Sequence, residues 1–219
     1  MAYRYAWLYI AKEDNTSAFD YNRQSIEAYA TLKDSQMVAE SYRQQAYIHE
    51  NMDSLDNALN ALRTGLQFID TVNNPSVGVI CNIYSNMTDV FVKKHQYDSA
   101  LVYANALLET KARRFPTYYI GSIFDRFLRA EVYAAMHRYK EALADYNASI
   151  SDMLTYYKDA PAQIAISYRN RGDFFRQIGE IDKAITDYQT AIDYFKKDSS
   201  SPIVRITSLE ERIQELKEK

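Results

Sequence analysis

The sequence predicts an all-α protein, namely an α-solenoid of about five helix–turn–helix repeats followed by a C-terminal capping helix. Three observations support this fold class. One short pattern occurs five times, a second pattern precedes each copy, and the prolines fall between the copies. The first pattern is clearest in HRYKEALADYNASI (137–150) and GEIDKAITDYQTAI (179–192), and it also occurs at 95–108, 53–66 and 13–26. The repeat step is about 42 residues, within the ~20–50 that indicate a repeat architecture, and only the first step is slightly shorter.

The recurring pattern describes the second helix of each repeat. An alanine is followed by a large apolar residue, and another large apolar residue comes seven positions later. These offsets lie on one face of a helix, so each copy predicts an amphipathic helix. The alanines are Ala18, Ala58, Ala100, Ala142 and Ala184, and the apolar residues are Phe19, Leu59, Leu101, Leu143, Ile185, Ile26, Leu66, Leu108, Ile150 and Ile192.

A first helix is predicted before each turn. Twelve positions before each alanine stands a small residue, and three positions after that residue stands an aromatic or histidine ring. A small residue allows two helices to approach closely, and the ring fills the space between repeats. The small residues are Ala6, Ala46, Thr88, Ala130 and Gly172, and the rings are Tyr9, His49, Phe91, Tyr133 and Phe175.

The prolines mark the repeat boundaries independently. Proline costs about 3 kcal/mol inside a helix but is tolerated in a first turn. All four prolines lie between the second helix of one predicted repeat and the first helix of the next. They are Pro75, Pro116, Pro161 and Pro202.

These motifs resemble the tetratricopeptide repeat family, whose pattern combines a small residue and a ring with a later alanine, an aromatic residue and a proline. The fifth repeat matches at Tyr168, Gly172, Phe175, Gly179, Ala184, Tyr188 and Ala191, and the fourth at Ala130, Tyr133, Ala142 and Tyr146. The first repeat departs from the pattern at Asn22, where an aromatic residue is expected. The repeat step exceeds the family's usual ~34 residues and is similar to the long repeats of kinesin light chain. The resemblance covers about residues 1–198 and implies a right-handed solenoid.

The repeats define the expected domains. We expect one superhelical domain at 1–202, with repeats at about 1–38, 39–80, 81–122, 123–164 and 165–202, and a helix in 203–219. In that helix Ser208 and Glu211 suggest a capping box, and Leu209, Ile213 and Leu216 form one apolar stripe. The helix either caps the solenoid or leads into another domain.

The N-terminal segment allows two interpretations. Tyr3, Tyr5, Trp7 and Tyr9 alternate as in a strand, whereas the repeat register predicts the first helix of repeat one. That helix would begin at or before Met1, so we expect a soluble segment excised from a longer protein, with an exported or membrane-linked protein as one alternative. The sequence leaves the compartment unknown, and also whether Met1 and Lys219 are natural termini.

The composition argues against several function classes. The net charge of −3 gives no basic field for nucleic acid, and no apolar run is long enough for a membrane helix. We therefore expect neither partner for this segment. His49 belongs to the ring positions, His95 and His137 lie in turns, and Cys81 is best explained as a buried apolar residue. We expect no metal, no cofactor and no enzymatic activity.

The resemblance implies a binding surface on the concave side, which the first helices of the repeats line. On those helices, the face opposite the packing positions carries rings, amides and charges of both signs, and Trp, Tyr and Arg are typical of binding hot spots. These candidate partner-binding residues are Tyr3, Trp7, Arg43, Tyr47, Glu50, Asn82, Asn86, Asp89, Phe127, Glu131, Arg169 and Asp173, and the same face also carries Ser85, Phe124 and Arg176. The alternative is that they are only solvated positions.

Two functions are compatible with this surface. The first is a non-catalytic protein–protein interaction module that holds a peptide or helix of a partner in its concave groove. The second is an extracytoplasmic or cytoplasmic sensor or regulatory region of a larger bacterial signalling protein. Some family members bind a terminal carboxylate through Lys, Asn and Arg, but Tyr47, Ser85 and Asp89 stand at such positions here. The sequence does not identify the partner or the oligomeric state.

Overall fold

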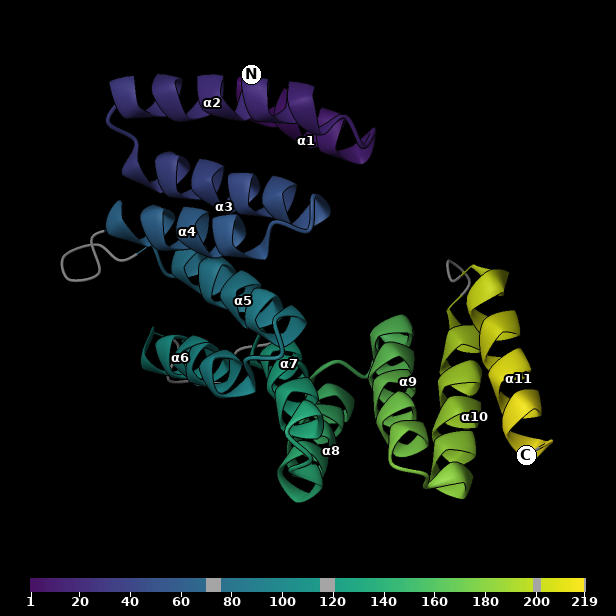
Figure 1. The fold of residues 1–219 in the computed structure, drawn as a ribbon. Helices are drawn as coiled ribbons and strands as arrows, with labels where there is room; N and C mark the ends of the chain where they lie inside the picture. Colours follow the sequence, from purple (N-terminus) through teal and green to yellow (C-terminus); the bar gives the residue numbers. More distant parts are fainter. Residues whose placement is uncertain (70–75, 115–120, 199–201, 219) are drawn as a thin grey trace. The chain divides into compact units, whose positions relative to one another are not determined.

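The computed structural model describes residues 1–69, 76–114, 121–198 and 202–218, and these residues contain eleven α-helices (Figure 1). No strand occurs in this described part, so the predicted all-α fold is confirmed. The helices belong to two compact units, Met1–Tyr119 and Ile120–Lys219. The predicted domain boundaries, with one domain reaching residue 202, stay a prediction.

The first unit contains three helix pairs. In each pair the two helices pack against each other, and α3 also contacts both α1 and α5. The first helices of the three pairs therefore share one face of this unit. The helices are α1 (Ala2–Ala11), α2 (Asn15–Thr31), α3 (Ser35–Asn51), α4 (Leu55–Gln67), α5 (Val77–Lys93) and α6 (Tyr97–Arg114).

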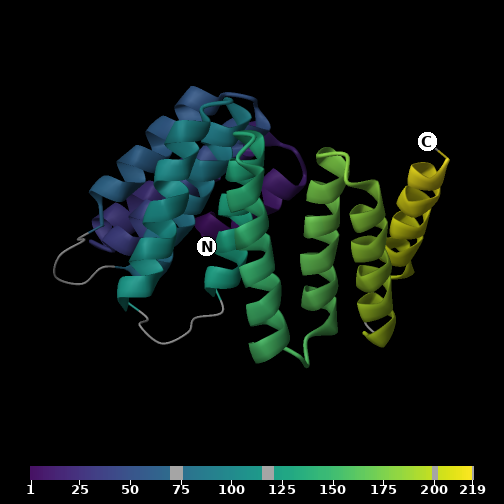
Figure 2. The same cartoon turned by 90° about the horizontal axis from the view of Figure 1, so that it is seen from below.

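The second unit contains two helix pairs and the last helix. In this unit α7 packs on α8, α9 packs on α10, and α7 also contacts α9. Helix α11 lies beside α10 (Figures 1 and 2). The helices are α7 (Gly121–Ala135), α8 (Tyr139–Tyr156), α9 (Pro161–Gln177), α10 (Ile181–Lys197) and α11 (Ile203–Lys217).

The turns inside the pairs share one backbone geometry. The carbonyl of each predicted ring residue accepts a hydrogen bond from the amide five positions later, as in Phe91 O with Gln96 N (2.9 Å) and Phe175 O with Glu180 N (2.9 Å). The residue just before that amide adopts positive φ, as in the Schellman motif that ends many helices. These residues are Glu13, Asp53, His95, His137 and Gly179. The histidines predicted in turns, His95 and His137, therefore occupy the positive-φ position of the turn.

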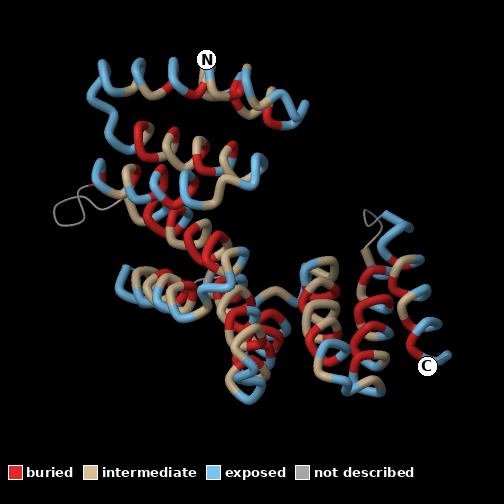
Figure 3. Tube along the Cα trace, viewed as in Figure 1, coloured by how far each residue is buried: buried red, intermediate tan, exposed pale blue. Residues whose placement is uncertain are grey.

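The small residues of the first helices lie in the interior of the helix pairs, and in Figure 3 the buried parts of each helix recur along one side. Gly172 makes the closest approach. A Cβ atom at this position would lie 2.8 Å from the ring of Tyr188 in α10. The absence of a side chain at Gly172 therefore sets the α9–α10 spacing.

Two ion pairs with buried aspartates and partly buried arginines occupy equivalent places in the second unit. Arg129 of α7 binds the Asp145 carboxylate of α8 through Nε and Nη2, at 2.7 and 2.8 Å. Arg171 of α9 binds Asp187 of α10 with the same two distances. The two arginines are one repeat step apart, and so are the two aspartates, which means that the pair recurs with the sequence period.

A polar network replaces the expected aromatic packing in the first repeat. Asn22 is fully buried, and its Nδ2 donates to Ser41 O (2.7 Å) and Gln44 Oε1 (3.1 Å). Gln44 Nε2 in turn donates to Tyr3 O at 3.0 Å. The departure of Asn22 from the family pattern is therefore matched by polar partners in α3, and Gln44 extends this network to α1.

The start of the last helix corrects one prediction. Helix α11 begins at Ile203 after Pro202, so Ser208 lies inside the helix and cannot cap it. The reason is that its apolar stripe begins one turn earlier, at Ile206. The predicted stripe of Leu209, Ile213 and Leu216 is confirmed as buried.

Pro161 is the first residue of α9, as a boundary proline should be. Pro75 and Pro116 lie outside the described residues. Met1 precedes a helix, α1, so the helical interpretation of the aromatic N-terminal segment is confirmed.

Candidate partner-binding surfaces

Aromatic residues from two helices meet on the face shared by α1, α3 and α5. The ring centroids of Trp7 and Tyr47 are 5.4 Å apart, and Tyr3 meets Trp7 edge-on at 6.4 Å. The guanidinium carbon of Arg43 lies 5.9 Å from the Trp7 centroid, within cation–π range. Tyr47 is 39% exposed. We name Tyr3, Trp7, Arg43 and Tyr47 the aromatic face.

Charged and amide groups hold the aromatic face in place from α3 and α5. Arg43 Nε donates to Glu40 Oε2 at 2.7 Å, and Asn82 Nδ2 of α5 donates to Glu40 Oε1 at 3.3 Å. Glu40 thus fixes the guanidinium beside Trp7 and links α3 to α5. Asn86 lies on the same helix as Asn82 and is partly buried.

A buried carboxylate lies at the other end of this shared face. The Glu50 side chain is 6% exposed, and its Oε2 accepts from Lys93 Nζ of α5 at 2.7 Å. Its Oε1 is buried without a hydrogen-bond partner in the described part of the chain. Burial, reinforced by the Glu50 charge and opposed by Lys93, raises the pKa of Asp89 to about 6.

Because its pKa is raised, Asp89 should lower the free energy of unfolding at pH values where it is ionised. Folded Asp89 holds a proton up to about pH 6, whereas the unfolded side chain loses it near pH 4. Stability should therefore fall as pH rises through this window. We expect Asp89→Asn to raise the free energy of unfolding at pH 7.5 by about 1–2 kcal/mol, because the amide is not charged at this pH and the carboxylate is. This range is below the full value of the pKa shift because Asp89 is partly exposed, and the gain should be smaller at pH 5.

Urea unfolding of the parent and the variant at both pH values measures this effect. Asp98→Asn, on the exposed start of α6, is the matched control and should give the same difference at both pH values. An Asp89→Asn gain that is equal at pH 5 and 7.5 would contradict the raised pKa.

A cleft of about 800 Å³ adjoins the aromatic face. Trp7 and Tyr47 form part of its wall, and polar side chains of Glu13, Asn15 and Asn51 complete it together with Ile10 and Ala11. The cleft is open, and it places two large rings beside hydrogen-bonding groups. This combination is suited to holding a side chain of another protein.

In the second unit, Phe127 is buried, whereas the sequence predicted it on the open binding surface. It is 4% exposed and packs against Tyr146 at 5.8 Å between centroids. The corresponding positions of other repeats, such as Arg43 and Arg169, are only partly buried. A large apolar side chain at such a position turns into the core, so Phe127 is left out of the binding surface.

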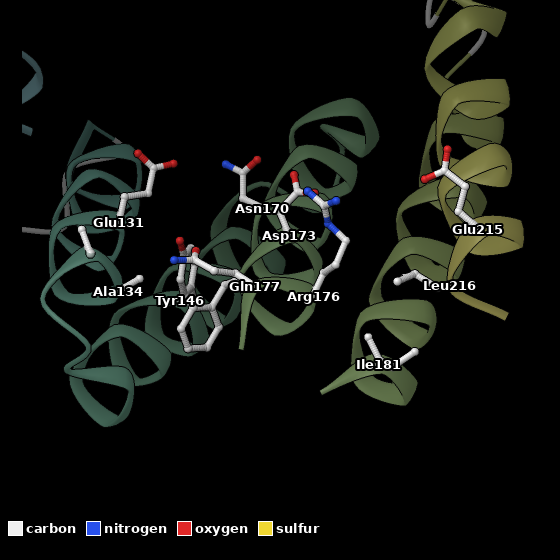
Figure 4. Close-up of a pocket in the computed structure, with 12 residues that line it drawn as sticks. Glu131, Ala134, Tyr146, Asn170, Asp173, Arg176, Gln177, Ile181, Glu215 and Leu216 are labelled. Carbon is white, nitrogen blue, oxygen red and sulfur yellow. The ribbon is translucent and has the colours of Figure 1, made fainter. Parts of the chain in front are cut away.

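Glu131 and Asp173 line a second cleft, of about 710 Å³, within the second unit (Figure 4). Asp173 Oδ1 accepts from Tyr188 Oη at 2.7 Å and from Arg212 Nη1 of α11 at 2.6 Å. Burial, with the Asp173 hydrogen bond, raises the pKa of Tyr188 to about 12. Arg169 donates to Asn170, which also lines the cleft.

Several residues of these surfaces were missed by sequence reasoning. Glu40 lies three positions before Arg43, and Lys93 four after Asp89, so charge spacing along one helix could have indicated both. Glu215 lines the second cleft and lies one repeat step after Asp173. Extending the repeat step into the last helix would have found it. Arg212 has no equivalent signal.

The three histidines lie in packing or turn positions. His49 meets the Phe19 ring at 4.9 Å, and burial lowers its pKa. His95 Nδ1 lies 2.8 Å from Tyr97 Oη, and His137 Nδ1 lies 2.7 Å from Tyr139 Oη. Among the described residues, no group of three His, Cys, Asp or Glu side chains is arranged to hold a metal ion.

No described helix is both long enough and apolar enough to cross a lipid bilayer.

The fold and the helix-pair surfaces are those of repeat proteins, and the comparisons identify the kind of repeat. Residues 125–197 match the tetratricopeptide repeat family. This match includes most of α7 and all of α8, α9 and α10. The resemblance predicted from the sequence is therefore confirmed, and this stretch consists of tetratricopeptide repeats. Comparison with curated protein sequences gives no match.

Solved structures with the same fold cover nearly the whole chain. A signal transduction ATPase with numerous domains from Pyrococcus horikoshii, described with a tetratricopeptide repeat sensor, is 16% identical with a TM-score of 0.76; the match covers 98% of this chain and 31% of that chain. A putative kinesin light chain from Podosopora anserina with TPR-like repeats is 12% identical with a TM-score of 0.72, covering 91% and 96%. The quorum sensor NprR from B. thuringiensis, without ligand, is 18% identical with a TM-score of 0.61, covering 99% and 60%. At these identities the likeness concerns the fold.

Proposed function

We propose that this chain is a non-catalytic protein–protein interaction module that holds a peptide or helix of a partner protein. The observation that carries the proposal is the aromatic face beside its open cleft. Trp7 and Tyr47 lie 5.4 Å apart, Arg43 lies over Trp7, and the two rings border about 800 Å³ of accessible space.

The energetics of recognition support this use. Trp, Tyr and Arg dominate binding hot spots because they bury much area and retain polar groups. Glu40 already orders the Arg43 side chain, and packing against Trp7 orders Tyr47. A partner would therefore pay little further side-chain entropy on binding here.

The test compares capture of proteins from an extract of the source cells by three immobilised forms of the chain. The first is the parent and the second is Arg43→Glu/Tyr47→Ala. The third, Arg23→Glu/Tyr156→Ala, makes the same changes at exposed positions of α2 and α8. Circular dichroism verifies that all three are folded.

We expect a partner that the parent and the control retain and that the Arg43→Glu/Tyr47→Ala variant loses. Once purified, that partner should bind the variant at least roughly tenfold more weakly, as removal of hot-spot residues predicts. Equal capture by all three forms would reject the aromatic face as the binding site.

A second candidate is the sensor or regulatory region of a larger signalling protein. One contact favours it, because Arg212 Nη1 joins the last helix to Asp173 in the second cleft at 2.6 Å. The Pyrococcus horikoshii and B. thuringiensis proteins, which share the fold, are described as containing a sensor and as a quorum sensor. The coding sequence after Lys219 distinguishes the two: a membrane helix, a kinase or a DNA-binding segment there favours the regulatory function.

A further inference from the structure

Three carboxylates from three helices line the cleft of the second unit. Glu131 of α7, Asp173 of α9 and Glu215 of α11 all line it, and Figure 4 shows them along the cleft from one helix to the next. Each lies one repeat step from the next, so the repeat places one carboxylate per first helix. We name Glu131, Asp173 and Glu215 the carboxylate column.

The charge balance of the cleft is negative. Its described lining carries three carboxylates and one cation, Arg176, and Arg212 adds a second cation at its edge through the pair with Asp173. Asn170 and Gln177 add amide groups that can donate or accept. The apolar floor, which includes Phe174, Ile181 and Leu216, lowers the local dielectric constant and so strengthens charge interactions beside it.

A hydroxyl group at the cleft floor also lacks a partner. Tyr146 is 3% exposed and lines the cleft. No hydrogen bond joins its Oη to any group in the described part of the chain, and this oxygen is not among the fully enclosed ones, so it faces the cleft that the residue lines. Burial and the charges of Glu131 and Asp173 raise its pKa, so the hydroxyl stays protonated. Its oxygen lone pairs are available to a donor entering the cleft.

One contact within the chain shows the kind of group that binds these carboxylates. The Arg212 guanidinium binds Asp173 Oδ1 at 2.6 Å at the edge of the cleft, where both side chains remain about one-third exposed (37% and 36%). A guanidinium is a planar donor suited to carboxylates, and an ammonium is a compact one. Either group can pair with a carboxylate, and Tyr146 Oη offers a further acceptor in the same cleft.

We infer that the cleft between α7, α9 and α11 binds a segment of a partner protein through an arginine or lysine side chain of that segment. This inference rests on the proposed function, because it names the kind of partner that the module recognises. An acidic segment is disfavoured there, since it would bring like charges together without pairing them.

A peptide selection tests the inference. The probe is a phage-displayed library of random dodecapeptides selected on the whole chain, and enriched peptides are resynthesised with a fluorescent label. We expect a recurrent arginine or lysine, and replacing it by glutamine should raise Kd roughly tenfold, as for a charged hydrogen-bonded pair.

Matched variants locate the site. Glu131→Gln/Glu215→Gln neutralises two exposed carboxylates of the cleft and should raise Kd about fivefold or more. The control Asp193→Asn/Glu210→Gln removes the same charge from exposed positions of α10 and α11 outside the cleft lining, and it should leave Kd within about twofold. Glu131→Lys/Glu215→Lys should shift the selection toward acidic peptides.

Tyr146→Phe separates recognition from structure. Because its hydroxyl has no partner to lose, this variant should keep or increase thermal stability while raising Kd about threefold or more. Loss of stability together with loss of binding would instead indicate a packing role for the hydroxyl.

The outcomes distinguish the inference from the function on which it depends. Enriched peptides without a basic residue, or basic peptides indifferent to Glu131 and Glu215, overturn the inference. If those peptides still depend on Arg43 and Tyr47, the proposed function stands. A selection that enriches no peptide over an uncoated surface counts against both.

Discussion

Replacing Arg171 by alanine should lower the free energy of unfolding by about 3–5 kcal/mol. The Asp187 carboxylate that it binds has a side chain only 5% exposed, and Arg171 Nη1 also donates to Asn147 Oδ1 at 2.6 Å. Removing the guanidinium leaves a buried charge without its partner, and this cost exceeds the net worth of the intact pair. Guanidinium chloride unfolding followed by circular dichroism measures the change.

Two further variants test the cause. Arg171→Lys keeps the charge but loses the two-point contact with Asp187, so it should be destabilised by less than the alanine variant. Arg138→Ala removes an arginine from an exposed pair with Glu141 and should cost no more than about 1 kcal/mol. If Arg171→Ala and Arg138→Ala cost the same, the buried pair is not a major determinant of the fold.

Gly172→Ala is expected to destabilise the protein by about 1–3 kcal/mol, even though alanine is the better helix former. The added Cβ would lie 2.8 Å from two ring atoms of Tyr188, which is fully buried and donates a hydrogen bond to Asp173. The ring has little room to yield, so α9 and α10 would have to separate. Thermal and denaturant unfolding report the loss.

Gly78→Ala is the matched control for this substitution. Gly78 lies near the start of α5, and a Cβ atom there would meet nothing within 4 Å. Alanine should therefore leave stability unchanged or raise it by up to about 1 kcal/mol. A gain in stability at both glycines would show that the α9–α10 contact tolerates a methyl group.

The helix pairs were predictable because one chemical pattern is repeated. Ala58, Ala142 and Ala184 are buried at the expected places, and Gly179 adopts the left-handed turn that its position requires. The repeat step, which only the first copy shortens, shows which face of each helix is apolar, because the copies differ in sequence and keep the residues that packing requires.

The candidate surfaces were less predictable because they depend on distances between helices. Periodicity indicates that Trp7 and Tyr47 share a face, but it does not give their 5.4 Å separation. Phe127 shares its register with Arg43 and yet is buried, since the identity of the side chain decides the outcome at a half-buried position. Similarly, the Arg212–Asp173 contact joins two helices at a separation that differs from the repeat step, so it leaves no trace in the repeat pattern.

Each buried arginine–aspartate pair of the second unit lies wholly inside one helix pair, with Arg129 and Asp145 in α7–α8 and Arg171 and Asp187 in α9–α10. Unequal recombination between such copies would therefore duplicate or delete one whole repeat without separating a buried cation from its anion. The array can change length in evolution while every new unit carries its own charge compensation. Contacts between neighbouring pairs, such as that of Lys93 with Glu50, are then the features that must be re-established when a copy is inserted.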